Sequence, residues 1–367
     1  MVYLKYKDYF NRIKDRKDTT MGIENVRKVK LGHYPTPLEK MENLTKLLGK
    51  GELFIKRDDT TGPAFGGNKA RKLEYLIREA IDTGCTAVLT VGGTQTNHGR
   101  TTVGAAVKYG LKPILVLSGK DTGYLSGNLN LDAMMGADIY FVANPADTPK
   151  VIEDVCEKYA QQGDKVYVIP GGGSNPVGAV GYIMSIKEIL DQMEEENLKI
   201  DHLVCTVGSM GTFGGMLLGA KYFNAPFDVI AVPVSPAPKG DKEKAVAEFA
   251  NKVSETYGMG ITISPEEVKI AYGPDDAPYS GEQYNKPDPI TREAIITLAM
   301  NEGIFLDPTY TGKTFRAFMD LVKEGDWIKE GENALFLHTG GAMALWTKEH
   351  LDDMQDQLRA NCKTTQL

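Results

Sequence analysis

The order of apolar and amphipathic segments between residues 70 and 169 restricts the fold of this chain more than any other feature. Short apolar runs, typical of buried strands, alternate there with longer segments of helical period. The expected strands lie at 87–91, 113–117, 138–142 and 166–169, and the expected helices at 70–83, 97–109, 126–135 and 148–162. Because parallel neighbouring strands require a crossover connection, this alternation predicts right-handed βαβ units around a parallel sheet. The sequence therefore predicts an α/β fold.

A second α/β unit is expected after residue 200. The further expected elements are strands at 52–56, 202–207, 229–234 and 334–337, and helices at 289–302 and 313–324. Residues 236–292 are rich in charge, proline and glycine, which favours helices with long loops that form a wall of the active site. A length of 367 residues is also typical of two domains.

Composition narrows the classes of function. The formal net charge of -7 argues against nucleic acid or an anionic membrane as the main partner, because both favour a basic surface. No window approaches 18 apolar residues, the start of the chain has no signal-peptide core, and the four cysteines include no CxxC pair. No HExxH or comparable spacing of ligands predicts a metal site. We therefore expect a cytoplasmic protein that binds small ligands.

One lysine is a candidate for covalent chemistry. Lys69 comes just after the flexible pair Gly66 and Gly67, and Lys72 lies one helical turn further on. Most lysines beside a glycine turn are solvated surface residues. The alternative is an amine that bonds an aldehyde cofactor, which requires burial or neighbouring cations to lower its pKa. Neither a GxSxG serine nor a cysteine triad competes for the role of nucleophile.

The segment from Gly208 to Thr212 joins an expected strand to an expected apolar helix. Backbone N–H groups and the helix dipole at such a junction suit a phosphate dianion. Glycine-rich turns of this kind also occur merely for close packing, and the pattern alone does not distinguish the two. It is not a dinucleotide fingerprint, because GxGxxG is absent there.

Two further polar clusters follow expected strands. Gly92 to His98 offers hydroxyls, amides and backbone donors that suit a substrate carboxylate, although the same residues suit a helix N-cap. Asp307 to Lys313 places Tyr310 at a loop tip, where a phenol can transfer protons. A packed amphipathic tyrosine is the alternative there, and also for Tyr284.

Together and in this order, the motifs resemble the D-cysteine desulfhydrase and 1-aminocyclopropane-1-carboxylate deaminase family of pyridoxal-phosphate enzymes, of the tryptophan-synthase-β fold type. The resemblance runs from about Pro35 to Trp346. Its motifs are Pro35–Leu38, Ile55–Asp59, Gly66–Glu74, Gly93–His98, Gly172–Asn175 with Gly178, Gly181 and Tyr182, Ser209–Gly215, Leu306–Lys313 and His338–Gly341.

This resemblance implies an α/β fold of type II, with two domains that each contain a mostly parallel twisted sheet flanked by helices. Residues 1–71 and 184–367 would form the large, cofactor-binding domain, and residues 72–183 a small domain inserted between its two parts. Related enzymes are commonly homodimers, so the resemblance also implies a homodimer.

The resemblance further implies the cofactor, pyridoxal 5′-phosphate, and the residues that hold it. Lys69 would bond the aldehyde and move the substrate's Cα proton, and Lys72 would help to hold the phosphate. The phosphate loop would consist of Ser209, Met210, Gly211 and Thr212. Asn97 would contact the pyridoxal 3′-oxygen, and Thr311 would face the pyridine nitrogen.

The substrate would be a small amino acid. Its carboxylate would be bound by Gln95, Thr96 and Asn97, and Thr96, Tyr284 and Tyr310 would join Lys69 as catalytic residues. Thr96 replaces the family's usual serine and adds a methyl group beside the reacting carbon. Thr311 stands where the deaminase branch has glutamate, and a hydroxyl there leaves the pyridine nitrogen largely unprotonated, which suits elimination better than ring opening.

The expected reaction is α,β-elimination, with D-cysteine giving pyruvate, hydrogen sulfide and ammonia as the first choice. The alternatives are an L-cysteate sulfo-lyase and a 1-aminocyclopropane-1-carboxylate deaminase. A β-replacement synthase and a non-catalytic sensor that binds the cofactor rank below these.

Overall fold

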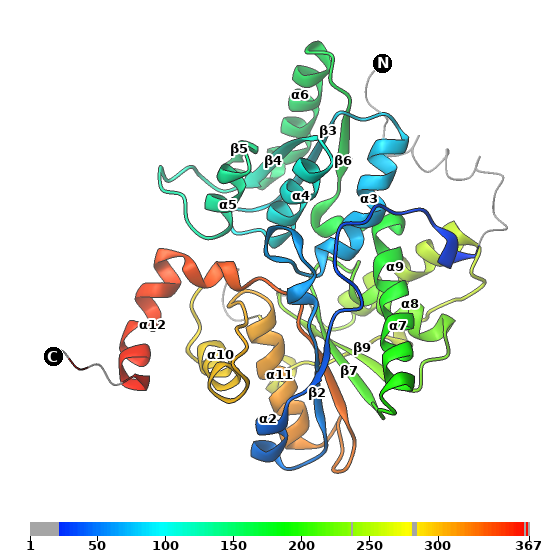
Figure 1. The fold of residues 1–367 in the computed structure, drawn as a ribbon, viewed down its shortest axis with the longest axis vertical. Coiled ribbons are helices and arrows are strands. Elements are labelled where there is room, and N and C mark those ends of the chain that lie inside the picture. Colours follow the sequence, from blue (N-terminus) through cyan, green and yellow to red (C-terminus); the bar gives the residue numbers. More distant parts are fainter. Residues whose placement is uncertain (1–21, 236–237, 281–284, 363–364, 366–367) are drawn as a thin grey trace.

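The computed structural model describes residues 22–235, 238–280, 285–362 and 365 of the chain. It contains two sheets flanked by helices, with the smaller sheet and α6 at one end of the molecule and α2 at the other (Figure 1). None of the described helices is long and apolar enough to cross a membrane. The α/β architecture predicted from the sequence is confirmed.

The larger sheet has six strands in the order β1-β2-β10-β7-β8-β9. They are β1 (Leu38–Lys40), β2 (Leu53–Lys56), β7 (His202–Val207), β8 (Asp228–Pro233), β9 (Lys269–Ile270) and β10 (Ala334–Leu337). β1 pairs antiparallel with β2, and the other pairs are parallel. β2, β7 and β10 are buried throughout, as expected of parallel strands covered on both faces.

The smaller sheet has four parallel strands in the order β5-β4-β3-β6. They are β3 (Ala87–Gly93), β4 (Lys112–Ser118), β5 (Asp138–Val142) and β6 (Val166–Ile169). Each lies where the sequence pattern predicts a strand. β3 and β4 are central, and β5 and β6 are the edge strands and are only partly buried.

Helices connect these strands. They are α2 (Glu42–Leu48), α3 (Lys69–Asp82), α4 (Asn97–Lys108), α5 (Asn128–Met134), α6 (Thr148–Gln161), α7 (Pro176–Glu195), α8 (Phe213–Tyr222), α9 (Asp241–Tyr257), α10 (Pro289–Glu302), α11 (Thr311–Glu324) and α12 (Lys348–Asn361). The sequence pattern did not predict α2, α7 or α12. It described residues 236–292 only as helices with long loops, and α9 is the one long helix in the described part of that segment.

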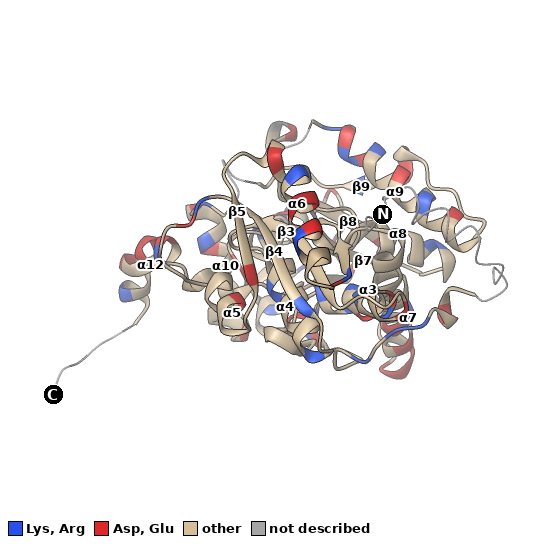
Figure 2. Cartoon of the chain, turned by 90° about the horizontal axis from the view of Figure 1, so that it is seen from above, with Lys and Arg blue, Asp and Glu red and all other residues tan. Residues whose placement is uncertain are grey.

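The hydrophobic core covers both faces of the larger sheet. α3, α7, α8 and α9 pack on one face, and α10 and α11 pack on the other. Charged residues of both signs are mixed on the outer helices, including α12 (Figure 2). Basic and acidic positions therefore alternate along the described ribbon in this view.

A buried cluster of charges joins the start of α3 to α7. Arg71 donates hydrogen bonds to Asp58 at 2.7 and 2.8 Å and to Glu188 at 2.8 Å. Lys56 donates to Glu188 at 2.7 Å, and Tyr182 donates to Asp58 at 2.6 Å. Because each charge in the cluster has a buried counter-charge, the loss of one member would leave the others uncompensated. The cluster therefore fixes the turn of α3 that follows Lys69.

The predicted domain boundaries, 71/72 and 183/184, fall inside α3 and α7. These two helices pack against each other in the main hydrophobic cluster. The structure shows no extended linker at either position, and the boundaries stay a prediction.

Candidate active site

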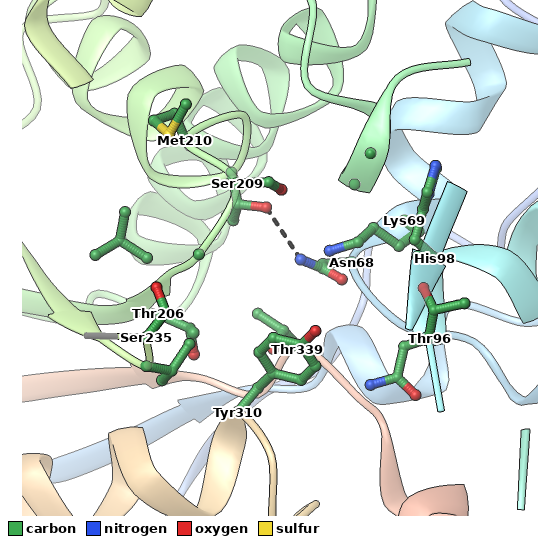
Figure 3. A pocket seen from close by; sticks show the side chains of 18 of the residues that line it. Asn68, Lys69, Thr96, His98, Thr206, Ser209, Met210, Ser235, Tyr310 and Thr339 are labelled. Carbon is green, nitrogen blue, oxygen red and sulfur yellow. Dashed lines mark hydrogen bonds between the residues drawn. The ribbon is translucent and has the colours of Figure 1, made fainter. Parts of the chain in front are cut away.

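A cavity of about 420 Å³ lies between the two sheets, at the carboxyl ends of their parallel strands. The segments that follow β3, β6, β7, β8 and β10 line it, together with the start of α3 and the loop before α11. Open α/β sheets bind ligands at this edge. Figure 3 shows Lys69, Thr96 and His98 on one side of the cavity and Ser209 and Met210 on the other. The predicted site residues on the lining are Lys69, Thr96, Asn97, Ser209, Met210, Thr212 and Tyr310.

Lys69 enters this cavity from the first turn of α3. Gly66 and Gly67, just before it, have φ angles of +64° and +113°, a backbone conformation that favours glycine. The Asn68 side chain donates a hydrogen bond of 3.0 Å to Thr212 Oγ1, drawn as the dashed line in Figure 3. The turn that carries the lysine is therefore tied directly to the Ser209–Thr212 loop on the opposite side.

Burial lowers the pKa of the amines in the site. The pKa of Lys69 falls to about 8 because of burial, with Asp307 opposing and Arg100 adding to the effect. Lys72 is fully buried and donates to the Gly172 carbonyl at 3.0 Å. Burial and the neighbouring Lys69 hold the Lys72 pKa well below its usual value. Lys69 thus has a substantial neutral fraction near neutral pH, as bond formation with an aldehyde requires.

The loop from Ser209 to Thr212 approaches Lys72 closely. A Cβ atom at Gly211 would lie 2.9 Å from Lys72 Nζ and 2.6 Å from Ser174 Oγ. The hydroxyls of Ser174 and Ser209 are 3.0 Å apart. Glycine at position 211 therefore allows the loop backbone, the serine and the buried amine to meet in one small space.

These groups fit a phosphorylated aldehyde. Among the described residues that line the cavity none is aspartate or glutamate, although Lys69 lies on the lining and Lys72 directly behind the loop. A phosphate dianion would supply the missing counter-charge. The hydroxyls of Ser209 and Thr212 and the N–H groups at the start of α8 would bind its oxygens. The residues present therefore suit pyridoxal phosphate, and the close-packing alternative for this loop does not account for the two buried amines.

The residues that follow β3 line the cavity and also begin α4. Thr96 lines the cavity and also caps α4, because its Oγ1 accepts a hydrogen bond from Gly99 N at 3.2 Å. Asn97 Oδ1 accepts from Arg100 Nη1 at 3.2 Å and from Asn128 Nδ2 at 3.0 Å, so the Asn97 Nδ2 group remains the donor for a ligand.

Gln95 lies outside the cavity lining. It is 7% exposed, its Nε2 donates to the Ser126 carbonyl at 3.0 Å, and its Oε1 accepts from Asn128 N at 2.9 Å. Both ends of its amide therefore stabilise the segment that leads into α5. The structure brings Thr96 and Asn97 to the predicted carboxylate site but places Gln95 behind it.

The loop before α11 is organised by Asp307. Its Oδ2 accepts from the backbone N–H groups of Thr309 at 3.0 Å and Tyr310 at 2.9 Å. Its Oδ1 accepts from the Thr311 backbone N–H and from Thr311 Oγ1, both at 2.7 Å. Tyr310 is thereby held on the cavity lining.

Thr311 itself is fully buried and is not on the lining. Its single hydroxyl proton is used by Asp307, so in this geometry it has none to offer a pyridine nitrogen. The role predicted for Thr311 stays a prediction that this geometry does not favour. Tyr284, the other predicted tyrosine, lies outside the described residues.

Sequence reasoning assigned no role to several residues of the site. Thr339, after β10, lines the cavity, and its carbonyl accepts from Asn68 N at 3.0 Å. His98 also lines it; burial, Lys69 and Lys72 lower its pKa well below the usual value, so the ring is neutral. The position of Thr339 just after β10 could have identified it, because residues that follow parallel strands lie at the ligand-binding edge of the sheet. Thr206, near the end of β7, and Ser235, which follows β8, also line the cavity.

Comparisons with known proteins identify the family of the chain. A family model described as pyridoxal-phosphate dependent enzyme matches residues 29–340. The 1-aminocyclopropane-1-carboxylate deaminase of Burkholderia vietnamiensis is 33% identical over 335 residues, which cover 89% of this chain and 97% of the relative. A Pyrococcus abyssi protein, which carries the same name with a provisional qualifier, is 39% identical over 310 residues, covering 84% of this chain and 89% of its own.

Solved structures give the same result. The crystal structure of a 1-aminocyclopropane-1-carboxylate deaminase homologue superposes with a TM-score of 0.80 at 33% identity, covering 93% of this chain and 98% of the other. A hydrogen sulfide-producing enzyme of Fusobacterium nucleatum, at 18% identity and a TM-score of 0.58, covers 86% of this chain and 97% of its own and shares the fold. The fold of type II, the cofactor and the lyase class predicted from the sequence are confirmed. The chain belongs to the pyridoxal-phosphate-dependent enzymes of fold type II, in the family of the 1-aminocyclopropane-1-carboxylate deaminases.

Proposed function

We propose that the protein catalyses α,β-elimination on D-cysteine, which releases hydrogen sulfide, and that one water molecule then hydrolyses the remaining aminoacrylate to pyruvate and ammonia. The observation that carries the proposal is the set of side chains on the cavity lining, which offers the hydroxyls of Thr339 and Tyr310 but, among the described residues, no carboxylate. A pyridine nitrogen beside a hydroxyl stays largely unprotonated and withdraws fewer electrons. Expulsion of hydrosulfide, a good leaving group, needs less electron withdrawal than the opening of a cyclopropane ring.

The cofactor, when bound, supplies an electron sink for the charge that develops at the substrate Cα. Lys69 removes the Cα proton, for which a pKa of about 8 is well matched to neutral pH. Thr96 and the positive end of α4 bind the substrate carboxylate. The Tyr310 phenol, held by Asp307 through the backbone, donates a proton to the departing sulfur. These roles of Lys69, Thr96 and Tyr310, and the cofactor contacts of Lys72, Asn97 and the Ser209–Thr212 loop, are part of the proposal.

A 1-aminocyclopropane-1-carboxylate deaminase is the second candidate. The names of the relatives favour it, including the Burkholderia vietnamiensis enzyme at 33% identity. An L-cysteate sulfo-lyase ranks lower, because a sulfonate needs a cation beyond those that hold the phosphate. Lys69 is the one lysine or arginine among the described residues on the lining.

The substrate test uses the cofactor-loaded protein with D-cysteine, L-cysteine, L-cysteate, β-chloro-D-alanine, D-serine and 1-aminocyclopropane-1-carboxylate. Keto acid, ammonia, sulfide and sulfite are measured for each. We expect equal amounts of pyruvate and sulfide from D-cysteine. Formation of 2-oxobutyrate from the cyclopropane alone would replace the proposal with the second candidate. A new amino acid in place of pyruvate would indicate a synthase, and a spectral change without ammonia would indicate a sensor.

We also propose that the protein is a cytoplasmic homodimer. Large apolar side chains exposed on the described surface support the dimer, among them Phe65 at 61%, Met134 at 75% and Trp346 at 60%. The free state of all four cysteines supports a reducing compartment. Sedimentation equilibrium should give twice the chain mass of 40.2 kDa, and cell fractionation tests the location.

A further inference from the structure

Arg100 lies behind the cavity and contacts two parts of the cofactor site. It is 1% exposed. Its Nη1 donates to Asn97 Oδ1 at 3.2 Å and to Asn128 Oδ1 at 2.7 Å, and its Nη2 donates to the Gly66 carbonyl at 2.9 Å. One guanidinium therefore holds both the asparagine predicted to contact the cofactor ring and the glycine turn that precedes Lys69.

Asp132, on α5, interacts electrostatically with the same guanidinium. Asn128, which contacts Arg100, and Asp132 are separated by four residues on this helix and so share one of its faces. Asp132 is fully buried, and neither of its carboxylate oxygens has a hydrogen-bond partner among the described residues. Arg100 Nε likewise has none within that part of the chain. Buried charged atoms without partners are rare in native proteins, which indicates a role for this pair.

The electrostatics of the pair point away from a purely structural role. Burial raises the Asp132 pKa to about 7, although Arg100 opposes the shift. Burial lowers the Arg100 pKa to about 10, although Asp132 and Asp307 oppose it. For both groups the cost of removing the charge from water exceeds the gain from the neighbouring charge. An ionised Asp132 therefore destabilises the folded chain, and such local costs are typical of functional sites.

We propose that Asp132 is a positioning residue for the cofactor: its carboxylate neutralises Arg100, and the neutralised guanidinium holds Asn97 in a fixed orientation toward the cofactor ring oxygen. The proposal rests on the proposed contact between Asn97 and that oxygen. Arg100 and Asn128 both donate to Asn97 Oδ1, so the orientation of the amide depends on where Arg100 lies. Asp132 acts on the guanidinium through its charge, because no hydrogen bond joins the two side chains.

Loss of the carboxylate has a second consequence at Lys69. Two acidic groups interact electrostatically with Arg100, namely Asp132 on α5 and Asp307 before α11. Arg100 in turn lowers the pKa of Lys69. Without Asp132 the positive charge of Arg100 is less compensated. The nitrogen of Lys69 should then lose its proton at lower pH.

The test compares Asp132→Asn and Asp132→Ser with the wild type and with Asp154→Asn, a matched control on the exposed side of α6. Asn97→Ala is measured in parallel. The readouts are the melting temperature of the cofactor-free protein, the dissociation constant of the cofactor, and the pH midpoint of the visible absorbance of the loaded protein. None of these depends on turnover.

We expect both Asp132 variants to melt at or above the wild-type temperature, to bind the cofactor about tenfold more weakly, and to shift the absorbance midpoint downward by up to about one pH unit. The Asp154 variant should match the wild type. An Asp132 variant with wild-type affinity and midpoint would overturn the proposal, whatever its melting temperature. Failure of both Asp132 variants to fold would also overturn it, because a stabilising carboxylate contradicts the argument.

The Asn97→Ala variant separates this proposal from the assignment on which it rests. If Asn97→Ala leaves affinity and absorbance unchanged, the contact between Asn97 and the ring oxygen is wrong. If Asn97→Ala changes them and the Asp132 variants do not, the assignment of Asn97 stands and the positioning role of Asp132 is wrong.

Discussion

Replacement of Gly211 by alanine tests whether the Ser209–Thr212 loop binds the cofactor phosphate. The new methyl carbon would lie 2.6 Å from Ser174 Oγ, 2.9 Å from Lys72 Nζ and 3.0 Å from Ser174 Cα. Carbon contacts are most favourable at about 3.5–4.0 Å, so the nearest neighbours must move by roughly 0.5–1 Å. The Lys72 amine and the Ser174 hydroxyl lie at the ends of side chains and can turn away, and the Ser174 Cα needs to move by only a few tenths of an ångström.

The cost of this displacement falls on the cofactor-bound state. Overpacking of this kind costs about 1–3 kcal/mol. If this cost arises only in the bound state, the dissociation constant of the cofactor becomes roughly 5- to 150-fold larger. In the free protein Lys72 can relax, whereas bound phosphate requires the loop, Ser174 and the amine in place together. We therefore expect weaker binding with little loss of overall stability.

Gly208→Ala, at the residue just before the loop, is the matched control. A methyl group there would have its nearest neighbours, Tyr310 Cε1 and Val234 Cγ2, at 3.9 Å, which is an ordinary contact. Titration of the cofactor-free variants with pyridoxal phosphate, followed by absorbance, gives both dissociation constants. We expect Gly208→Ala to stay within about twofold of the wild type. Wild-type affinity of the Gly211 variant would refute the placement of the phosphate in this loop.

Three further predictions concern the base, the proton donor and the scaffold. The rate at which pyridoxal phosphate bonds to the cofactor-free protein should rise through a midpoint near pH 8, because the neutral amine reacts and the Lys69 pKa is about 8; a rise that continues beyond pH 10 would contradict this. Tyr310→Phe should keep the absorbance of the bound cofactor but release pyruvate about 10²–10⁴-fold more slowly, and unchanged turnover would remove the phenol from the reaction. Arg71→Met should lower the free energy of unfolding by about 3–5 kcal/mol in urea titrations, because Asp58 and Glu188 lose their shared cation; a loss below about 1 kcal/mol would show that the cluster is not structural. In the wild type the pKa of Glu188 is lowered to about 2, so its contribution to stability should be complete above about pH 5 and be lost as the pH falls toward 2.

Hydrophobic pattern was sufficient for most strands and for the helices with one apolar face. Val204, for example, lies in a run buried at every position, which only a central strand explains. α7 was missed because it is buried on most sides and so lacks a clear polar face. Its start nevertheless carried a readable signal, since the Asn175 side chain accepts from Gly178 N at 2.8 Å and Pro176 takes the first helical position.

The site was predictable in its location but less so in its orientations. The glycine-rich turns alone left the roles of Lys69 and Ser209 open, and the resemblance to a known family assigned both to the site. Both residues lie on the cavity lining. Gln95 and Thr96 are adjacent in sequence, yet the turn directs Thr96 to the cavity and Gln95 to Asn128. The hydroxyl of Thr311 turns to a carboxylate four residues earlier, a contact that spacing alone does not reveal.

Reduction of the loaded protein with borohydride, followed by peptide mapping, tests the central claim most directly, since it fixes the cofactor to the amine that holds it. We expect one pyridoxyl group per chain, on Lys69 at the start of α3. A label on Lys72 or on any other lysine, or no label at all, would contradict it.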